Sequence, residues 1–279
     1  MYKLLSARTT SDPLMLLLQG PPASGKTTAA LTFPNPVVAN FDRGLTTATV
    51  EGLQQIPFYD DNFCVKTLGW AKHNEKGIVN KRDGFKKWLA TEAMKIEPDQ
   101  TFILDSWSAL QSAEELQSRV AEIHMTKGNP PTINEREPWA LKLEFSKDVM
   151  SLMQNMRCNV VVIAHDRNTV NEQGELTDRV SPLQDGQFKF MISRFFSDIY
   201  RQHCVSSKLP NGKPMVINGV ELTGDYNYFW QVRSNNTFLA KSRYTYASTL
   251  VPATYKSIPI NNLPVSATNT GVKPSQSSK

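Results

Sequence analysis

An eight-residue segment near the amino terminus, Gly20-Pro-Pro-Ala-Ser-Gly-Lys-Thr27, limits the folds open to this chain because it fits the pattern GxxxxGK[ST]. The apolar run 14–18 precedes it, and the helix-compatible stretch 27–33 follows it. In this setting Gly20 and Gly25 permit a backbone that wraps closely around an anion, with successive amide N–H groups pointing inward. We therefore predict a phosphate-binding loop. Its residues are Gly20, Pro21, Pro22, Ala23, Ser24, Gly25, Lys26, Thr27 and Thr28.

Two residues of this loop have specific expected roles. Lys26 is expected to bridge the β- and γ-phosphates of ATP, and the Thr27 hydroxyl is expected to bind Mg²⁺. Such a loop also needs an acidic residue at the end of a neighbouring strand to hold the magnesium ion through water. The run 101–105 ends in Asp105, which we predict as this carboxylate, with a helix N-cap as its alternative role.

Two further strand ends carry groups that fit a role in hydrolysis. Strand 158–164 is apolar and ends before His165. In one division of P-loop folds this strand lies between the loop strand and the Asp105 strand, so that His165 would face the γ-phosphate. A solvent-exposed histidine is the alternative. Asp42 follows strand 37–41 and is a candidate to polarise the attacking water, with ordinary turn chemistry as its alternative.

Two cations late in the chain, Lys241 and Arg243, are separated by one residue. In a strand, alternation would place both side chains on one face. Such a pair can reach the γ-phosphate bound by a neighbouring copy and neutralise the charge that develops in the transition state. A solvated face is the alternative.

Apolar runs alternate with helical patterns from residue 14 to residue 164, which predicts an α/β fold with a mainly parallel central sheet flanked by helices. From about residue 196, shorter segments with turn signals predict antiparallel hairpins that extend this sheet. We expect a core over residues 1–256 and a flexible polar tail over residues 257–279. The predicted strands are 14–19, 37–41, 101–105 and 158–164, and one predicted helix covers 139–156.

The composition excludes several classes of protein. With 40% hydrophobic residues, 20% charged residues and a net charge of +5, the chain is neither disordered nor collagen-like. Its longest apolar run is too short for a membrane span and no apolar signal core is visible, so we expect a cytoplasmic protein without membrane contact. Cys64, Cys158 and Cys204 lie in apolar or strand-like surroundings, which favours buried free thiols.

Positive charge is unevenly distributed. Residues 66–95 contain eight Lys and Arg against three acidic residues, and no acidic residue follows Asp225. Such stretches can bind phosphate backbones, although a solvated basic helix face is the alternative. Trp70, Phe85 and Trp88 lie among the lysines of the first stretch and can offer stacking surfaces to bases, with core packing as the alternative.

Five segments together make the chain resemble the RecA-like core ATPases, and most closely the short phage-encoded single-strand annealing proteins. The matching segments are GPPASGKT at 20–27, NFDRGL at 40–45, FILDSWSAL at 102–110, VVVIAHD at 160–166 and AKSR at 240–243. The resemblance implies a RecA-like P-loop NTPase fold, slow ATP hydrolysis coupled to single-stranded DNA, and pairing of complementary strands. It also implies a homo-oligomer in which Lys241 and Arg243 act on the next protomer's nucleotide, a single-strand DNA-binding protein as a further partner, and the host cytoplasm as location.

Members of this family bind DNA through loops after the third and fourth strands. The resemblance assigns these loops to residues 125–138 and 166–186. Acidic residues bring the net charge to zero in the first loop and to −3 in the second, so charge gives this assignment no independent support. The cations in the two loops are Lys127, Arg136, Arg167 and Arg179.

Two functions of other classes stay open. A P-loop kinase would transfer the γ-phosphate to a small molecule, and it is expected to have its acidic strand beside the loop strand. An ATP-gated assembly or motor protein with a protein partner would show the same motifs. ATPase measurements with single-stranded DNA and with small phosphate acceptors distinguish these functions.

Overall fold

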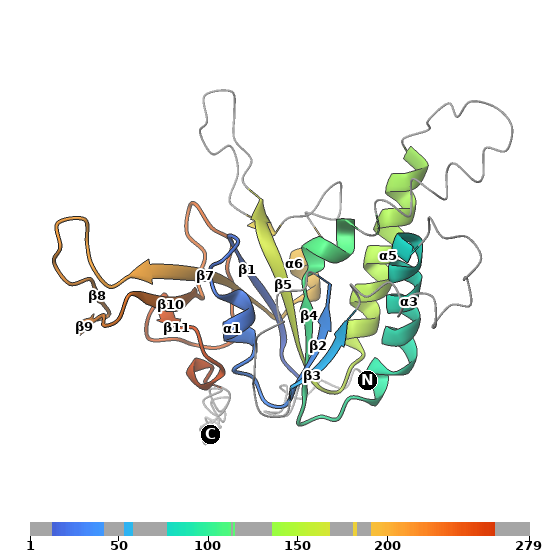
Figure 1. The fold of residues 1–279 in the computed structure, drawn as a ribbon, viewed down its shortest axis with the longest axis horizontal. Helices are drawn as coiled ribbons and strands as arrows, with labels where there is room; N and C mark the ends of the chain where they lie inside the picture. Colours follow the sequence, from blue (N-terminus) through green and yellow to red (C-terminus); the bar gives the residue numbers. More distant parts are fainter. Residues whose placement is uncertain are drawn as a thin grey trace, which may run out of the picture.

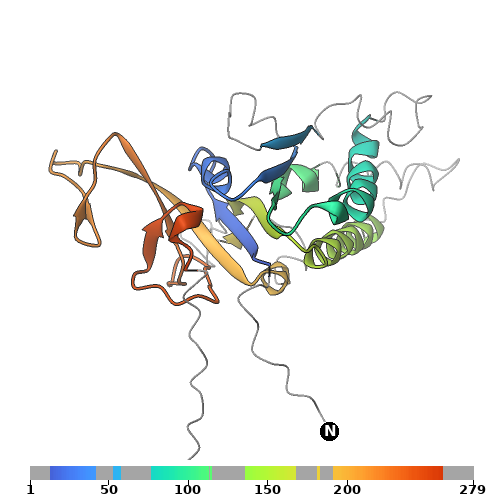
Figure 2. The same cartoon turned by 90° about the horizontal axis from the view of Figure 1, so that it is seen from below.

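The computed structural model describes most of the chain between residues 13 and 259, and Figures 1 and 2 show its elements from two directions. The described residues are 13–41, 53–57, 77–112, 114, 136–167, 181–182 and 191–259. Only the backbone is described at residues 57, 77–83, 136–139, 141, 167 and 181–182.

A nine-stranded sheet organises the described residues. Parallel neighbours follow one another in the order β7-β1-β5-β4-β2-β3, and β10 and β11 continue beyond β7 as antiparallel strands. The predicted α/β class, with a mainly parallel sheet and antiparallel carboxyl-terminal strands, is confirmed. The parallel strands are β1 (Met15–Gly20), β2 (Pro36–Asn40), β3 (Gln54–Pro57), β4 (Thr101–Asp105), β5 (Asn159–Arg167) and β7 (Asp198–Ser206). The antiparallel strands are β6 (Ser181–Pro182), β10 (Tyr226–Gln231) and β11 (Leu250–Pro252).

The strand that carries the phosphate-binding motif has β5, not β4, as its neighbour. Val161 of β5 pairs with Leu16 of β1 on one side and with Ile103 of β4 on the other. This order confirms the predicted position of strand 158–164 between the loop strand and the Asp105 strand. Because parallel strands end at the same edge of a sheet, the carboxyl ends of β1, β4 and β5 meet there.

Both faces of the sheet are covered. Two long helices, α3 and α5, lie side by side over one face (Figures 1 and 2). On this face Leu17 of β1 belongs to the same core cluster as the buried residues of both helices. On the other face, Leu16 and Leu18 pack with α1 and the carboxyl-terminal segments. This alternation along β1 is what a parallel strand buried on both faces requires. The helices are α1 (Lys26–Ala30), α3 (Gly77–Thr91), α5 (Arg136–Gln154), α6 (Ile192–Phe195) and the short 3₁₀ helices η1 (Ala93–Lys95) and η3 (Tyr255–Ser257).

Two of the three aromatic residues of the basic stretch belong to the core, and the third, Trp70, lies outside the described residues. Phe85 is fully buried in α3, and the ring of Trp88 packs on Phe102 with 5.9 Å between ring centroids. Their suggested role as exposed stacking surfaces for bases is therefore wrong, and core packing accounts for both. The apolar residues of this helix pack in the core, whereas Lys87 is exposed and Lys86 forms an ion pair with Asp148 of α5.

The carboxyl-terminal region differs in detail from the predicted hairpins. β7 is a nine-residue strand parallel to β1, and the hairpin of β8 (Val216–Ile217) and β9 (Val220–Glu221) forms a separate small sheet. Lys241 forms only an isolated bridge with Ile199, so the strand predicted around it is absent. The backbone leaves the ladder here because Arg243 donates its N–H to the Asp198 side chain instead.

One smaller expectation is also corrected, whereas the division predicted at residue 256 stays a prediction. Ile258, two residues after it, is buried in the same core cluster as Leu16 and Leu18. Cys158 is buried as expected, but Cys204 is exposed because β7 extends past its neighbour β1. Cys64 lies outside the described residues. In the part of the chain that the structure describes, no helix is long and apolar enough to cross a membrane.

Candidate nucleotide-binding site

The loop between β1 and α1 adopts a conformation that requires its two glycines. Gly25 caps α1 with φ 84° and ψ 19°, in the left-handed region that side chains disfavour. A Cβ atom on Gly25 would lie 2.6 Å from the ring of Tyr228, and one on Gly20 would lie 3.0 Å from the main-chain oxygen of Gln202. The loop is thus packed against β7 and β10, which sequence reasoning did not anticipate.

The ammonium group of Lys26 lies inside the curve of this loop. Its Nζ donates hydrogen bonds to the main-chain oxygens of Gly20 (2.9 Å) and Pro21 (2.7 Å), and the residue is only 5% exposed. The hydroxyl of Ser24 is buried in the same loop, without a hydrogen-bond partner among the described residues. A buried cation and a buried hydroxyl within a turn of backbone amides fit a phosphate group.

The predicted magnesium ligands meet. The Thr27 hydroxyl donates a hydrogen bond of 2.8 Å to Oδ2 of Asp105, although the two residues are 78 positions apart. Asp105 ends β4 and is 2% exposed. A hydroxyl and a carboxylate are the hard oxygen ligands that Mg²⁺ prefers, so these two residues fit the ion. The helix that follows is instead capped by Ser106, whose Oγ accepts the N–H of Ala109.

His165 lies beside Lys26, as expected for a group at the tip of β5. Its Nδ1 is 3.5 Å from the Lys26 Nζ. The N–H of His165 donates to Oγ of Ser108, at 3.0 Å, which ties the end of β5 to the helical turn after β4. Ser108 was not predicted. The polar residues that follow Asp105 in an otherwise apolar segment are the signal that could have identified it.

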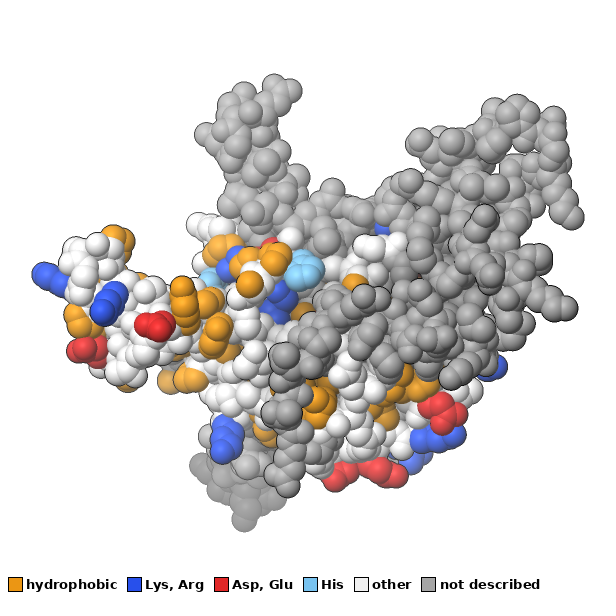
Figure 3. Space-filling view, viewed as in Figure 1, with side chains coloured by type: hydrophobic (Ala, Val, Ile, Leu, Met, Phe, Trp, Pro, Cys, Tyr) orange, Lys and Arg blue, Asp and Glu red, His pale blue; other side chains and the backbone are white. Residues whose placement is uncertain are grey.

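An ion pair next to this group was also missed. Arg201 of β7 binds Asp166, with Nη2 2.7 Å from Oδ2 and both side chains almost buried. Burial raises the pKa of Asp166, while Arg201, Lys26 and His165 oppose this shift. The carboxylate is therefore surrounded by positive or polar groups of the site. Figure 3 shows basic side chains (Lys and Arg in blue) next to histidine side chains (pale blue) near the middle of the visible face.

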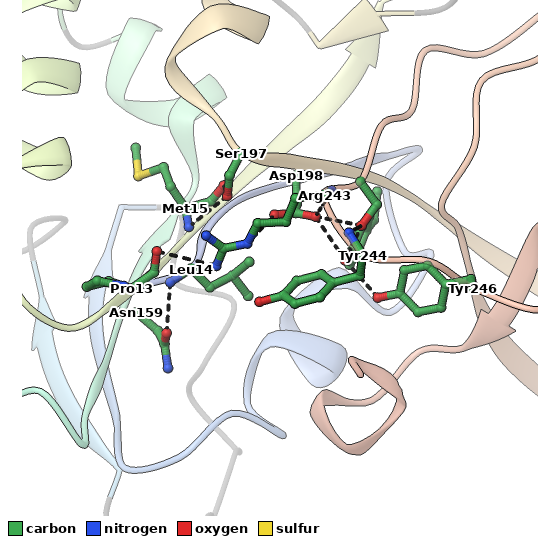
Figure 4. A network of polar contacts seen from close by, with 11 residues as sticks. Pro13, Leu14, Met15, Asn159, Ser197, Asp198, Arg243, Tyr244 and Tyr246 are labelled. Carbon is green, nitrogen blue, oxygen red and sulfur yellow. Dashed lines mark hydrogen bonds and ion pairs between the residues drawn. The ribbon is translucent and has the colours of Figure 1, made fainter. Parts of the chain in front are cut away.

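Lys241 and Arg243 lie elsewhere. Figure 4 shows Arg243 near Pro13 and the beginning of β1, whereas the phosphate loop follows the end of that strand, about 17 Å away. The Arg243 Nε is 3.4 Å from Oδ2 of the fully buried Asp198. Lys241 donates to the main-chain oxygen of Ser193. Within one protomer neither cation joins the site, and their action on a neighbouring protomer stays a prediction.

The remaining predicted residues are not tested by side-chain geometry. Asp42, Lys127 and Arg179 lie outside the described residues. Arg136 begins α5 and Arg167 ends β5, but only their backbone is described. Their roles in water activation and DNA binding stay predictions.

Comparison with known proteins identifies the family of this chain. A comparison with curated proteins found no match. The family model described as an AAA domain, AAA_24, matches residues 12–244, which include the phosphate loop, Asp105, His165 and Arg201. Because this match covers most of the chain, the protein belongs to the AAA_24 family of AAA-type P-loop ATPase domains.

Proposed function

We propose that this chain hydrolyses ATP to ADP and phosphate with Mg²⁺, and that it acts on single-stranded DNA in phage recombination or annealing. The observation that carries the ATPase part is the 2.8 Å hydrogen bond between Thr27 and Asp105, beside the Lys26 ammonium. It supports hydrolysis because the cation and the pair of oxygen ligands occupy the same edge of the sheet. The DNA part rests on the resemblance to annealing proteins.

Lys26 and the loop amides would bind the phosphates. The Lys26 ammonium now bonds two neutral carbonyl oxygens, those of Gly20 and Pro21. Exchange of these acceptors for charged phosphate oxygens strengthens its hydrogen bonds, because attraction between opposite charges is then added to each bond. The same ammonium then neutralises negative charge between the β- and γ-phosphates.

Thr27 and Asp105 would hold Mg²⁺ at the same edge. When bound, the ion neutralises charge on the β- and γ-phosphate oxygens. The Thr27 hydroxyl would offer an oxygen lone pair to the ion and would keep its proton for the hydrogen bond to Asp105. The backbone of Asp105 is held at this edge because its main-chain oxygen accepts the N–H of Phe41.

Hydrolysis requires an attacking water and a base. The water oxygen forms a bond to the γ-phosphorus, the bond to the β–γ bridging oxygen breaks, and the base takes one proton from the water. Asp42 is our candidate for this base. His165, 3.5 Å from Lys26, is proposed to contact the γ-phosphate and to respond when it leaves.

The proposed DNA contacts follow one helix and one strand. α5 begins and β5 ends toward the edge of the phosphate site (Figure 1), and Arg136 and Arg167 mark these two points. This common edge supports a coupling between nucleotide and DNA. Lys127 and Arg179 are proposed to act with them.

Assembly is the remaining part of the proposal. We infer a homo-oligomer with nucleotide between protomers, where Lys241 and Arg243 act in trans, in the host cytoplasm with a single-strand DNA-binding protein as a further partner. Such sharing makes the ATPase rate per protomer rise with protein concentration. A constant rate per protomer for a demonstrated monomer would contradict it.

The test is ATP hydrolysis by the full chain with and without single-stranded DNA. We expect stimulation by DNA, and a loss of at least about 100-fold in rate for Lys26→Ala, because the positive charge at the phosphates is removed. Lys95→Ala is the matched control, since Lys95 is exposed and pairs only with Glu92 among the described residues. An unchanged rate for Lys26→Ala would eliminate the loop as the active site.

Further arms of this experiment address the other functions. To test for a kinase, small phosphate acceptors are added instead of DNA. Transfer of the γ-phosphate to one of them would contradict our proposal. The strand order speaks against this outcome, because β5 separates β1 from the acidic strand β4. Hydrolysis that does not respond to DNA would remove the DNA part and favour an assembly or motor protein.

A further inference from the structure

The ion pair between Asp166 and Arg201 crosses the end of the strand that leads into the phosphate loop. Arg201 of β7 is in register with Gln19 of β1, while Asp166 directly follows His165, the register partner of Gly20 on β5. The two charged groups therefore belong to the strands on either side of β1. Their contact, with Nη2 2.7 Å from Oδ2, joins these strands directly at the root of the loop.

The guanidinium of Arg201 is held by further contacts. Its Cζ lies 3.7 Å from the centroid of the Phe238 ring, and Nη1 is 3.3 Å from Nδ1 of His203. Nε2 of the same histidine is 3.2 Å from Oε1 of Gln231. A neutral ring that donates from Nε2 and accepts at Nδ1 satisfies both contacts. Arg201 is thus fixed in one orientation, with its side chain 11% exposed.

Stability alone does not account for such a pair. Burial of two charges costs about as much free energy as their attraction returns, and apolar replacements of buried pairs are often neutral. Oδ1 of Asp166 and Nε of Arg201 are buried without a hydrogen-bond partner among the described residues, so the pair is not optimised for stability. Asp166 is adjacent to His165, whose ring lies next to Lys26. This location relates the pair to the phosphate site.

We propose that Asp166 and Arg201 are positioning residues for ATP turnover, which hold the end of β5 so that His165 faces Lys26. This inference rests on the proposed ATPase function. The loop amides and Lys26 do not depend on the pair, so binding of the α- and β-phosphates persists without it. Alignment at the γ-phosphate is lost, because the end of β5 then loses its side-chain contact with β7, although Ser108 and the backbone pairing of β5 remain.

The test compares Arg201→Gln, Arg201→Lys and Asp166→Asn with the parent chain. Hydrolysis gives kcat and KM, and titrations give the dissociation constants of MgADP and of the slowly hydrolysed MgATPγS. Asp166→Asn keeps the size of the side chain, so it carries the test if Arg201→Gln fails to fold. Lys86→Gln is the control, because Lys86 forms an exposed ion pair with Asp148 between α3 and α5.

We expect kcat to fall at least about 10-fold in Arg201→Gln and Asp166→Asn, since small misplacements of reacting groups have large effects on rate. The MgADP dissociation constant should change less than about threefold, while the preference for MgATPγS over MgADP disappears. Arg201→Lys should retain more activity than Arg201→Gln because it keeps the charge. Lys86→Gln should resemble the parent.

Three results would overturn the inference. The first is a kcat within about twofold of the parent value in folded Arg201→Gln or Asp166→Asn. The second is a loss of MgADP affinity as large as the loss of kcat. The third is an equal loss of kcat in Arg201→Lys and Arg201→Gln. The second result would mean that the pair only supports the fold. A parent chain that neither binds nor hydrolyses ATP would instead overturn the proposed function, before any variant is compared.

Discussion

The Thr27 hydroxyl donates a hydrogen bond to the Asp105 carboxylate, and this bond joins the first turn of α1 to a strand two places away from β1 in the sheet. It crosses the end of β5, the strand between them. The order β1-β5-β4 therefore leaves the carboxylate close enough to share an ion with the loop threonine. A site of this kind depends on charge as well as on shape.

Asp105→Asn separates these two contributions. The amide oxygen can still accept the Thr27 hydrogen bond, so the fold and the loop should be retained, but the negative charge toward Mg²⁺ is lost. We expect the Mg²⁺ concentration for half-maximal hydrolysis to rise by about 10-fold or more, a typical effect for a weakened metal site. Magnesium titrations of the ATPase rate measure this. Thr91→Ala at the end of α3 is a neutral control, and an unshifted midpoint would remove Asp105 from the metal site.

Gly25→Ala tests the packing of the phosphate loop against Tyr228. The added methyl group meets a positive φ of 84°, which costs about 1–2 kcal/mol, and a ring 2.6 Å away. Gly212→Ala is the matched control because Gly212 has φ 78° and no atom within 4 Å of its added Cβ. We expect Gly25→Ala to lower the free energy of unfolding more than Gly212→Ala, and to abolish nucleotide binding. Equal losses of stability would contradict the contact with Tyr228.

Arg243→Ala tests the role of this residue within its own chain. Asp198 is fully buried, and its Oδ1 accepts hydrogen bonds from Ser242 Oγ and from the Arg243 N–H. Removal of the guanidinium leaves the buried carboxylate without its counter-ion, so we expect the free energy of unfolding to fall by about 3 kcal/mol. The additional change Asp198→Asn should recover part of this loss. Denaturant titration measures both, and stability equal to the parent would contradict an internal role.

The local motifs of this protein could be read from the sequence because each depends on a short segment. Gly20 and Gly25 are needed because the loop backbone leaves no room for a side chain at these positions. Strands such as Thr101–Asp105 are apolar at consecutive positions because they are buried on both faces. The same reasoning failed for Lys241. Its segment alternates like a strand, but side-chain bonds to Asp198 replace the ladder.

The missed part of the site depends on register between distant strands. Arg201 reaches Asp166 only because β7 is parallel to β1, and Tyr228 reaches Gly25 only because β10 follows β7. β7 mixes apolar and polar residues without a clear period, so its neighbours cannot be inferred from its sequence. Residues brought together by the pairing of β7 and β10 thus escaped prediction, whereas Asp105 and His165 were predicted because each follows an apolar strand that its own sequence reveals.

Cys158 and Cys204 should differ in reactivity toward thiol reagents. Burial raises the pKa of the Cys158 thiol, so little reactive thiolate forms at pH 8, whereas Cys204 is exposed on β7. In a chain that carries Cys64→Ser and Cys204→Ser, we expect slow labelling of the native protein and rapid labelling of one thiol in denaturant. The companion chain with Cys64→Ser and Cys158→Ser should be labelled rapidly without denaturant. Similar native rates in the two chains would contradict the burial of Cys158.

His203 should make stability depend on pH. Burial, and secondly the neighbouring Arg201, lower the pKa of His203 from its ordinary value of 6.5. Below pH 6.5 the unfolded chain therefore binds this proton more readily than the folded chain, so the free energy of unfolding falls as the pH decreases through that range. His203→Gln removes this contribution and should flatten the change between pH 7.5 and pH 5.5, measured by denaturant titration at each pH. The raised pKa of Asp166 acts in the opposite direction, but it is common to both proteins in this comparison. Parallel stability curves for the parent and His203→Gln would show that the histidine exchanges its proton equally in both states.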